Sequence, residues 1–391
     1  MQVRHLYFNS MSNSAKNIKF KNDIKEFFKN ETVLVVSFVL AVASAFVVKP
    51  SKDYVDYIDF RTIGLLFSLM VIMAGLNSIG VFSFLARSVL KSVKKFSGLA
   101  LVLVVLCFFM SMLVTNDVAL ITFVPFTIVT LKMAKGKRKL IYIVVLETIA
   151  ANLGSMLTPI GNPQNLYLFS AYHMGIGEFF KTVVPYGALS LAVLVLCCIF
   201  SSRRSITVNI EDIERKPVDK KLFAVYCVLF ILAVLCVLRV IHYLVIVAAV
   251  IIVVLIADRK TLKKVDYSLL FTFVFLFIFI GNLGNISSVN QFLKNVVEGN
   301  EVVAGIVSSQ FISNVPAAVL LSGFTENACA LLVGVNIGGL GTLIASMASL
   351  ISFKFIQKES VSTVKYILRF TGFNVLFLAV NIALWLVISY A

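Results

Sequence analysis

The chain has 391 residues, of which 60% are hydrophobic and 14% are charged, and its mean hydropathy is +0.98. Soluble globular proteins are about 45–50% apolar and about 25% charged, so this composition excludes a soluble enzyme, a fibrous protein and a disordered chain. The formal net charge of +16 fits basic cytoplasmic loops of a membrane protein better than a nucleic-acid partner. We therefore predict an all-α polytopic membrane protein whose first partner is the lipid bilayer.

Apolar segments near or above the ~20 residues of a helical crossing recur along the chain. Residues 1–30 are polar and basic, and we expect them to form a cytoplasmic N-terminal tail. Nine full spans are predicted, at residues 32–48, 60–85, 140–170, 182–200, 222–238, 243–257, 267–286, 328–353 and 366–389. Two further apolar segments, 97–131 and 302–325, need a separate interpretation.

Lys and Arg indicate the orientation of the spans. Six clusters hold 29 of the 35 basic residues, and the positive-inside rule places these clusters in the cytoplasm. Segment 97–131 has a cluster at each end, so we expect a hairpin that enters from inside and returns. Segment 302–325 has acid-bearing flanks, so we expect a hairpin that enters from outside. With nine spans the path predicts a multi-pass protein of the cell (inner or plasma) membrane, with a cytoplasmic N-terminus.

An internal repeat relates the two halves. Residues 151–166 align without gaps on residues 335–350, and each copy follows one of the hairpins. The identical pairs are Asn152/Asn336, Gly154/Gly338, Thr158/Thr342, Ile160/Ile344 and Leu166/Leu350. Because the two copies run in opposite directions, we predict an inverted-topology repeat, an architecture of many secondary transporters. The domains are then a first repeat at 31–200, a cytoplasmic linker at 201–221 and a second repeat at 222–391. The alternative to an internal repeat is chance similarity between Gly- and Ala-rich helices.

Two spans are predicted to break within the membrane. Backbone freed from a helix in hydrocarbon costs several kcal/mol per unsatisfied group unless it lines a polar cavity. We interpret both breaks as parts of a substrate site, against the alternative of simple packing kinks. The residues of the breaks are Gly161, Pro163, Gly338 and Gly341, and the polar residues beside them are Thr158, Asn162, Asn165, Thr342, Ser346 and Ser349.

The predicted hairpin turns carry matched polar residues, Thr115-Asn116 in the first and Ser313-Asn314 in the second. An Asn amide both donates and accepts hydrogen bonds, which suits an oxyanion, a neutral oxyacid or a coordinated Na⁺. Asn is also a favoured turn residue in any protein. Since these turns lie within apolar segments, we interpret all four residues as substrate-binding.

Two acids fall deep within apolar segments, Asp117 and Glu147. An ionisable residue in the membrane interior is costly and is by default a functional hypothesis. We expect Asp117 to carry H⁺ or bind Na⁺ and so to couple transport. Glu147 precedes Asn152 by about one turn and is expected near the same cavity; alternatively, it pairs with a neighbouring hydroxyl or stays protonated.

Four stretches carry a resemblance to a known family: MSMLVTNDVALITFVPF, LGSMLTPIGNPQNLYLF, SSQFISNVPAAVLL and GVNIGGLGTLIASMASLI. The chain resembles the ion transporter superfamily, and within it the citrate-transporter-like and arsenite-pump-like (CitM/ArsB/NhaD-type) permeases. The resemblance implies a scaffold domain and a mobile transport domain that holds both hairpins and both broken helices and moves as an elevator. The Asn-Asp pair at the first tip is more similar to the arsenite and Na⁺/H⁺ branches than to the dicarboxylate branch.

The sequence therefore predicts a secondary active transporter, not an enzyme, that moves a small anion or oxyacid coupled to H⁺ or Na⁺. A Na⁺/H⁺ antiporter, an arsenite or antimonite efflux permease and, from another class, an ion channel remain alternatives. No metal-ligand spacing is present, so no cofactor and no metal beyond Na⁺ is expected. A homodimer is left open, and no nucleic-acid partner is expected.

Overall fold

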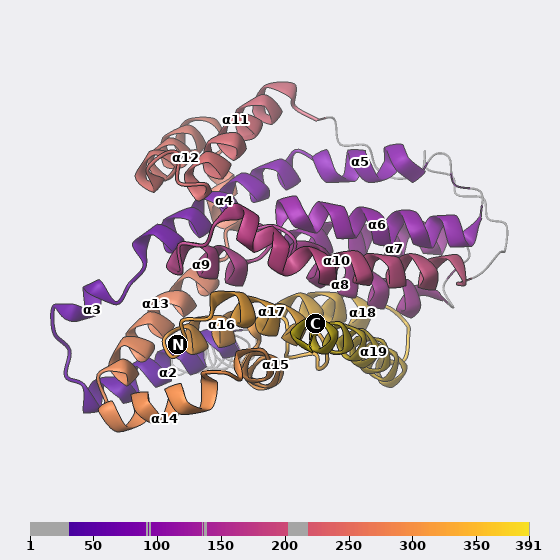
Figure 1. The fold of residues 1–391 in the computed structure, drawn as a ribbon. Helices are drawn as coiled ribbons and strands as arrows, with labels where there is room; N and C mark the ends of the chain where they lie inside the picture. The colour runs from indigo at the N-terminus through magenta and orange to yellow at the C-terminus, as the bar shows by residue number, and fades with distance from the viewer. Residues whose placement is uncertain are drawn as a thin grey trace, which may run out of the picture. The chain divides into compact units, whose positions relative to one another are not determined.

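The computed structural model describes residues 31–90, 93, 95–134, 136, 139–201 and 218–390. The predicted tail at 1–30 and residues 202–217 of the predicted linker lie outside the described residues. Within the described ranges every regular element is a helix (Figure 1). Seven of these helices are long and apolar enough to cross a membrane. The predicted all-α polytopic class is confirmed.

The helices group into two compact units. Unit 1 takes residues up to Ile58 together with Tyr267–Ile286, and unit 2 takes Asp59–Asp266 together with Ser287–Ala391. Each unit thus draws helices from both predicted halves of the chain.

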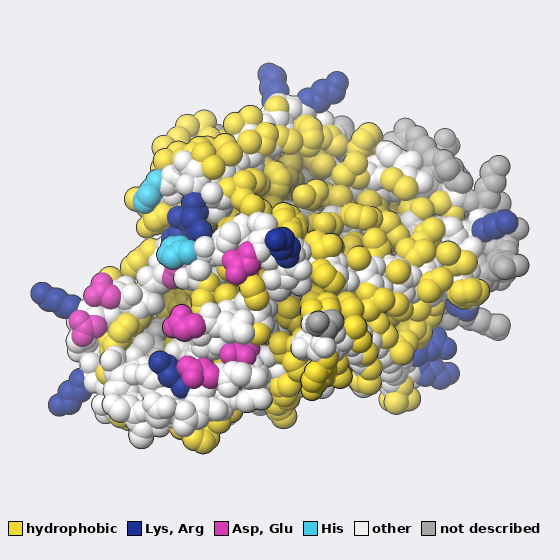
Figure 2. Space-filling view, viewed as in Figure 1, with side chains coloured by type: hydrophobic (Ala, Val, Ile, Leu, Met, Phe, Trp, Pro, Cys, Tyr) yellow, Lys and Arg dark blue, Asp and Glu magenta, His cyan; other side chains and the backbone are white. Residues whose placement is uncertain are grey.

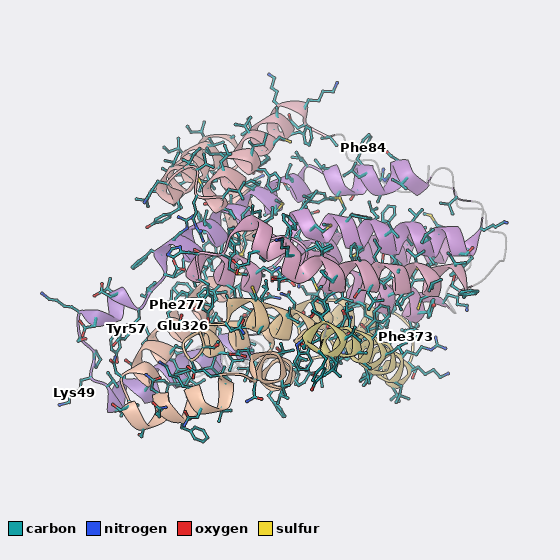
Figure 3. All side chains as sticks on the ribbon, viewed as in Figure 1. Lys49, Tyr57, Phe84, Phe277, Glu326 and Phe373 are labelled. Carbon is teal, nitrogen blue, oxygen red and sulfur yellow. The ribbon has the colours of Figure 1, made fainter. Side chains whose placement is uncertain are left out.

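Unit 1 contains α2 (Thr32–Val47), α3 (Asp53–Asp56) and α13 (Tyr267–Gly284). The side-chain amide of Asn282 donates to the hydroxyls of Ser44 and Tyr54, both at 2.9 Å, and so joins α13 to α2 and α3. A Cβ atom at Gly281 would lie 2.3 Å from the ring of Tyr57, so only glycine lets this ring pack on α13 (Figure 3).

Unit 2 holds the remaining helices. Its first part contains α4 (Phe60–Ser78), α5 (Val81–Leu90), α6 (Phe96–Val114), α7 (Asn116–Met133), α8 (Leu140–Ser155), α9 (Pro163–Ala171) and α10 (Ile176–Ile199). Its second part contains α11 (Lys220–Val237), α12 (Tyr243–Ala257), η3 (Arg259–Lys264), α14 (Ser287–Val297), α15 (Glu301–Ile312), α16 (Asn314–Ser322), α17 (Ala328–Gly338), α18 (Met347–Gln357) and α19 (Thr363–Tyr390).

Three elements differ from the predicted spans. The span predicted at 60–85 is two helices, α4 and α5, because Gly80 between them adopts φ +77°, which ends a right-handed helix. The span predicted from residue 182 begins earlier, at Ile176, where Gly175 caps the helix. Helix α14 occupies a stretch that the hydropathy pattern leaves between segments, since a helix with a polar face gives no long apolar run.

Each hairpin packs against the broken helix that follows it: α6 on α8, and α15 on α17. A Cβ atom at Gly154 of α8 would lie 2.2 Å from the carbonyl oxygen of Phe108, and one at Gly338 of α17 would lie 2.7 Å from Ser309 Oγ. These two glycines are matched positions of the repeat. Glycine is required at both because the helix backbones come too close for any side chain.

The two hairpins connect to opposite ends of unit 2. At one end, Lys132 at the end of α7 forms an ion pair of 2.9 Å with Glu359 after α18. We call this the basic end; Lys139 also lies there and donates to the carbonyl of Ser201 at 3.0 Å.

At the other end, Tyr172 after α9 donates to the carbonyls of Ser322 and Thr325, which close the α15–α16 hairpin, at 3.0 and 2.8 Å. We call this the acidic end because Glu301, Glu326 and Glu178 lie there. Figure 3 labels Glu326 beside α16 and α17.

Hydrophobic side chains cover most of the face shown in Figure 2, while many Lys and Arg side chains project at its margins. Large apolar side chains are exposed in both units, such as Phe46 (85%) in unit 1 and Ile256 (81%) in unit 2. Exposed apolar area on this scale is unfavourable in water and is the surface that a protein presents to lipid.

Candidate substrate site

The two hairpin tips are built alike. Thr115 and Ser313 adopt φ +73° and +72°, and each is followed by an Asn that starts the next helix. The backbone N–H of Asn116 donates to the carbonyl of Gly161 at 3.1 Å, and the backbone N–H of Asn314 donates to the carbonyl of Ala345 at 2.9 Å. Gly161 and Ala345 are matched positions of the repeat, so each tip is fixed to its own helix break by the same backbone bond.

The tips also carry the same local cost. Positive φ with ψ near 153° is a conformation that non-glycine residues rarely adopt, at roughly 1–3 kcal/mol each. The hydroxyl of Ser313 is buried without a hydrogen-bond partner among the described residues. A glycine at position 313 would avoid both costs, so the hydroxyl side chain there does not serve the stability of the tip.

Polar side chains of the two halves meet between the tips. Ser346 Oγ donates to Asn152 Oδ1 at 2.9 Å, and Asn162 Nδ2 donates to Asn336 Oδ1 at 3.1 Å. These two bonds join matched positions of the repeat and link the halves reciprocally. Asn116 Nδ2 also donates to Asn152 Oδ1, at 3.3 Å. One amide oxygen thus joins the first tip, the first broken helix and the second broken helix.

Asn314, the second tip, lies against the same centre. A Cβ atom at Gly339 would lie 2.7 Å from Asn314 Nδ2, and the carbonyl of Gly339 accepts from Asn152 Nδ2 at 3.5 Å. We call the following residues the central cluster: Asn116, Asn152, Asn162, Asn165, Asn314, Asn336 and Ser346. All seven are buried.

The first break is ordered by two Asn residues. Asn162 Oδ1 accepts a hydrogen bond from the backbone N–H of Asn165 at 2.9 Å and so caps α9, whose first residue is Pro163. Asn165 Nδ2 donates to the carbonyls of Met156 and Thr158, both at 3.0 Å. The freed carbonyls therefore have partners, and α9 starts at the centre.

The second break is ordered by Gln310, a residue that the sequence analysis missed. Its Nε2 donates to the carbonyls of Gly338 and Leu340 at 2.8 and 3.0 Å, and its Oε1 accepts from the amide of Thr342 at 3.0 Å. The matched position in the first hairpin is Met112, so comparison of the halves gives no signal for Gln310. Gly341, with φ +109°, makes the turn.

Glycine at position 161 in the first break has a steric reason. A Cβ atom there would lie 2.0 Å from the carbonyl oxygen of Ser155. Of the other residues predicted to break the helices, Pro163 is the first residue of α9 and Gly338 is the last residue of α17.

Thr158 and Thr342 were predicted to bind substrate, but their hydroxyls are directed to the hairpins. Thr158 Oγ1 donates to the carbonyl of Met112, and Thr342 Oγ1 donates to the carbonyl of Gln310 at 3.3 Å. Both threonines therefore tie a break to the helix beside it. Ser349 is fully buried one turn after Ser346, and its hydroxyl has no partner in the described part of the chain.

The two acids predicted to lie deep within apolar segments are found in different places. Asp117 follows the first tip directly; its amide donates to Asn116 Oδ1 at 2.9 Å, and one of its carboxylate oxygens is buried without a described partner. Glu147 is fully buried in α8, where Thr127 of α7 donates to its Oε1 at 2.5 Å. Thr127 lies eleven residues along α7 from the tip, so the structure brings Asp117 but not Glu147 to the central cluster.

Comparison with known proteins identifies the family. A profile of the citrate transporter family (CitMHS) matches residues 28–328. An uncharacterised transporter of Methanocaldococcus jannaschii is 36% identical over 298 residues, which cover 76% of this chain and 81% of the relative. The inner membrane protein YbiR of Escherichia coli is 32% identical over 325 residues, which cover 81% of this chain and 86% of the relative.

A more distant relative is the silicon efflux transporter LSI3 of Oryza sativa subsp. japonica. It is 29% identical over 152 residues, 38% of this chain and 31% of the relative. The long matches to transporters and the family profile agree with the helical membrane fold described above. The chain is a transporter that belongs to the citrate transporter family.

Proposed function

We propose that this protein is a secondary active transporter that moves a small anion or oxyacid across the cell membrane, coupled to H⁺ or Na⁺. The substrate binds at the central cluster, between the two hairpin tips. The observation that carries this proposal is Asn152 Oδ1, which accepts hydrogen bonds from Asn116 and Ser346 and so joins one tip to both broken helices. A dense polar centre within apolar segments of a membrane protein is by default a functional site.

The helix ends at the centre support a site for both an oxygen-rich solute and a cation. Helices α7, α9, α16 and α18 begin there, and α6, α8, α15 and α17 end there. N-termini present amides and partial positive charge to oxygen atoms, whereas C-termini present carbonyls to cations. The arrangement therefore favours a solute and a coupling ion bound close together.

The inverted repeat remains a proposal, supported by paired contacts. The tip-to-break bonds, the reciprocal bonds between the halves and the two close glycines all recur at matched positions. The chain enters and leaves the two hairpins at opposite ends of unit 2, at the basic end for the first hairpin and at the acidic end for the second. With the basic end in the cytoplasm, one hairpin enters from each side, as alternating access between two halves requires.

Asp117 is the proposed coupling residue, because it is the acid that lies at a tip. Its matched position, Val315, carries no charge, so the two tips are not equivalent for a cation. Glu147 is the alternative carrier, in a separate place between α7 and α8.

The side chains of the central cluster are uncharged, which favours a neutral oxyacid as the second candidate substrate. Each of the seven side chains in the cluster is an amide or a hydroxyl, and the nearest described ionisable residue in sequence, Asp117, is an acid and not a base. A trianion such as citrate would enter this site without a cationic side chain from the cluster, which is unfavourable in a buried place. A neutral oxyacid needs only donors and acceptors, and the similarity to a silicon efflux transporter points the same way.

Counterflow in proteoliposomes tests the function. Purified protein is reconstituted in vesicles loaded with unlabelled citrate, succinate, phosphate, arsenite or silicic acid, and a trace of the labelled compound is added outside. A transporter gives transient accumulation of label for its own substrate. Uptake that never exceeds equilibrium for any compound, together with ion currents down a gradient, would instead establish a channel.

A further inference from the structure

At the first helix break, one side-chain amide nitrogen lies among three backbone carbonyl oxygens. Asn165 Nδ2 donates to the carbonyls of Met156 and Thr158, both at 3.0 Å, and lies 3.4 Å from the carbonyl oxygen of Ser155. Asn165 Oδ1 accepts from Asn336 Nδ2 at 2.7 Å. This bond fixes the amide, because a reversed amide would place its oxygen against three carbonyl oxygens. The nitrogen therefore occupies the place where these carbonyls converge.

At the second break, Gln310 of α15 forms the same arrangement. Its Nε2 donates to the carbonyls of Gly338 at 2.8 Å, Leu340 at 3.0 Å and Ile306 at 3.1 Å. Its Oε1 accepts from the backbone N–H of Thr342 at 3.0 Å. Since a backbone N–H can only donate, the amide oxygen faces that N–H and the nitrogen faces the carbonyls.

The two halves reach this arrangement with residues that are not matched in the repeat. The carbonyls of Met156 and Leu340 are matched, and each accepts from an amide nitrogen. The position matched to Asn165 is Ser349, a shorter residue whose hydroxyl is fully buried without a partner in the described part of the chain. In the second half the nitrogen comes from Gln310 instead. An amide at the same place from two different helices favours a role that both breaks need. We call Asn165 and Gln310 the closing amides.

Carbonyl oxygens freed at a helix break are groups that coordinate Na⁺ in transporters with broken helices. An amide N–H presents partial positive charge to these oxygens and fills the place where they converge, so a cation finds neither space nor free ligands there. We propose that the closing amides exclude cations from both helix breaks. The coupling ion is then confined to the first tip, where one carboxylate oxygen of Asp117 is buried without a described partner. This inference rests on the proposed function, in which Asp117 carries the coupling ion.

The carbonyls at the far end of each break are occupied as well. The carbonyl of Gly161 accepts from the backbone N–H of Asn116, and that of Ala345 accepts from the backbone N–H of Asn314. Each hairpin tip thus places a further N–H against its own break. This agrees with closure of the breaks to a cation.

Thermal unfolding in the presence of Na⁺ tests the closure without transport. Every variant carries Asp117→Asn, which removes the proposed ion carrier, so any remaining effect of Na⁺ belongs to another place. Gln310→Glu replaces the nitrogen that faces the carbonyls by an oxygen of similar size, and Gln310→Ala removes it. Gln291→Glu is the matched control, because Gln291 is exposed on α14 and bonded to Asn295. Each purified protein is unfolded in detergent in NaCl and in choline chloride of equal ionic strength, at pH 7 and at pH 9.

We expect Asp117→Asn alone to unfold at the same midpoint in both salts. With Gln310→Glu added, the midpoint should rise by about 2 °C for each tenfold increase in Na⁺ above its dissociation constant. The rise should be larger at pH 9, because protons compete with Na⁺ for the new carboxylate. Gln310→Ala should show a smaller rise, since its open carbonyls can coordinate Na⁺ without a negative charge. Gln291→Glu should show none.

A Na⁺-dependent rise in Asp117→Asn alone would overturn the inference, because a cation would then bind away from the first tip. Equal midpoints in both salts for both Gln310 variants would also overturn it, because removal of the amide nitrogen would have opened no cation site. Absence of counterflow for every compound, together with the expected Na⁺ responses, would refute the proposed function and leave the closure of the breaks supported.

Discussion

Replacing the side chain of Asn116 or of Asn314 by alanine tests whether the hairpin tips bind substrate or only stabilise the fold. Asn116→Ala deletes one hydrogen bond of 3.3 Å to Asn152 and one of 2.9 Å from the Asp117 amide. The backbone bond from the Asn116 amide to Gly161 stays, as does its counterpart between Asn314 and Ala345. We therefore expect each Ala variant to lose only about 1 kcal/mol of unfolding free energy, the usual net value of one or two such bonds.

Substrate affinity should respond much more strongly. Each tip amide offers a donor and an acceptor to the solute, and a hydrogen bond to a charged ligand is worth roughly 1.5–3 kcal/mol, or about 10- to 150-fold in affinity. Asn381→Ala is the matched control: Asn381 is buried in α19, bonded to Ser190 and remote from the tips. This variant should lose stability without losing affinity.

The assay is a thermal unfolding series in detergent with increasing concentrations of the compound that gives counterflow. A ligand that binds the native state raises the apparent stability by mass action, so the concentration dependence reports affinity and the ligand-free midpoint reports stability. Wild-type affinity in both tip variants would refute a site between the tips. Equal loss in the Asn381 control would show that the effect is global.

Three further outcomes are expected. A cysteine at the exposed position Lys139 should react with impermeant thiol reagents only from the cytoplasm and one at Glu326 only from outside, in a background without native cysteines; labelling of both from one face would exclude opposed hairpins. Asp117→Asn should still exchange substrate at equal concentrations but fail to build a gradient, and a variant that builds a gradient as well as the wild type would remove Asp117 from coupling. Gly154→Ala should lower the unfolding free energy by at least about 2 kcal/mol through overlap with α6. Gly177→Ala, where nothing lies within 4 Å, should leave it unchanged or raise it slightly; similar values for the two would show that α8 and α6 are not in close contact.

The parts of the fold that depend on local sequence could be predicted. Apolar runs, Gly and Pro at the breaks and Asn at the turns are local signals, and helices, both hairpin turns and both breaks are found at those places. The division at Gly80 was missed because one glycine within a long apolar run does not show whether its φ is positive.

The parts of the site that depend on contacts between the halves could not be predicted in full. Asn152 and Asn336 were noted as identical residues of the repeat, yet only the fold shows that each accepts a bond from the other half. Gln310 had no signal, because its matched residue is Met112 and its partners are backbone carbonyls. Glu147 was expected near the same cavity as Asn152 or, alternatively, paired with a neighbouring hydroxyl, and only the fold shows that its partner is the hydroxyl of Thr127 on α7.

The backbone of Thr115 and Ser313 has a consequence for engineering. Laboratory selection for heat resistance alone should replace both residues by glycine, because glycine adopts their positive φ without steric cost and, at position 313, leaves no buried hydroxyl unsatisfied. Such a variant would gain thermal resistance while its tips lost both side-chain hydroxyls and conformational restraint. The two positions are therefore places where a more durable protein is expected to be a poorer transporter.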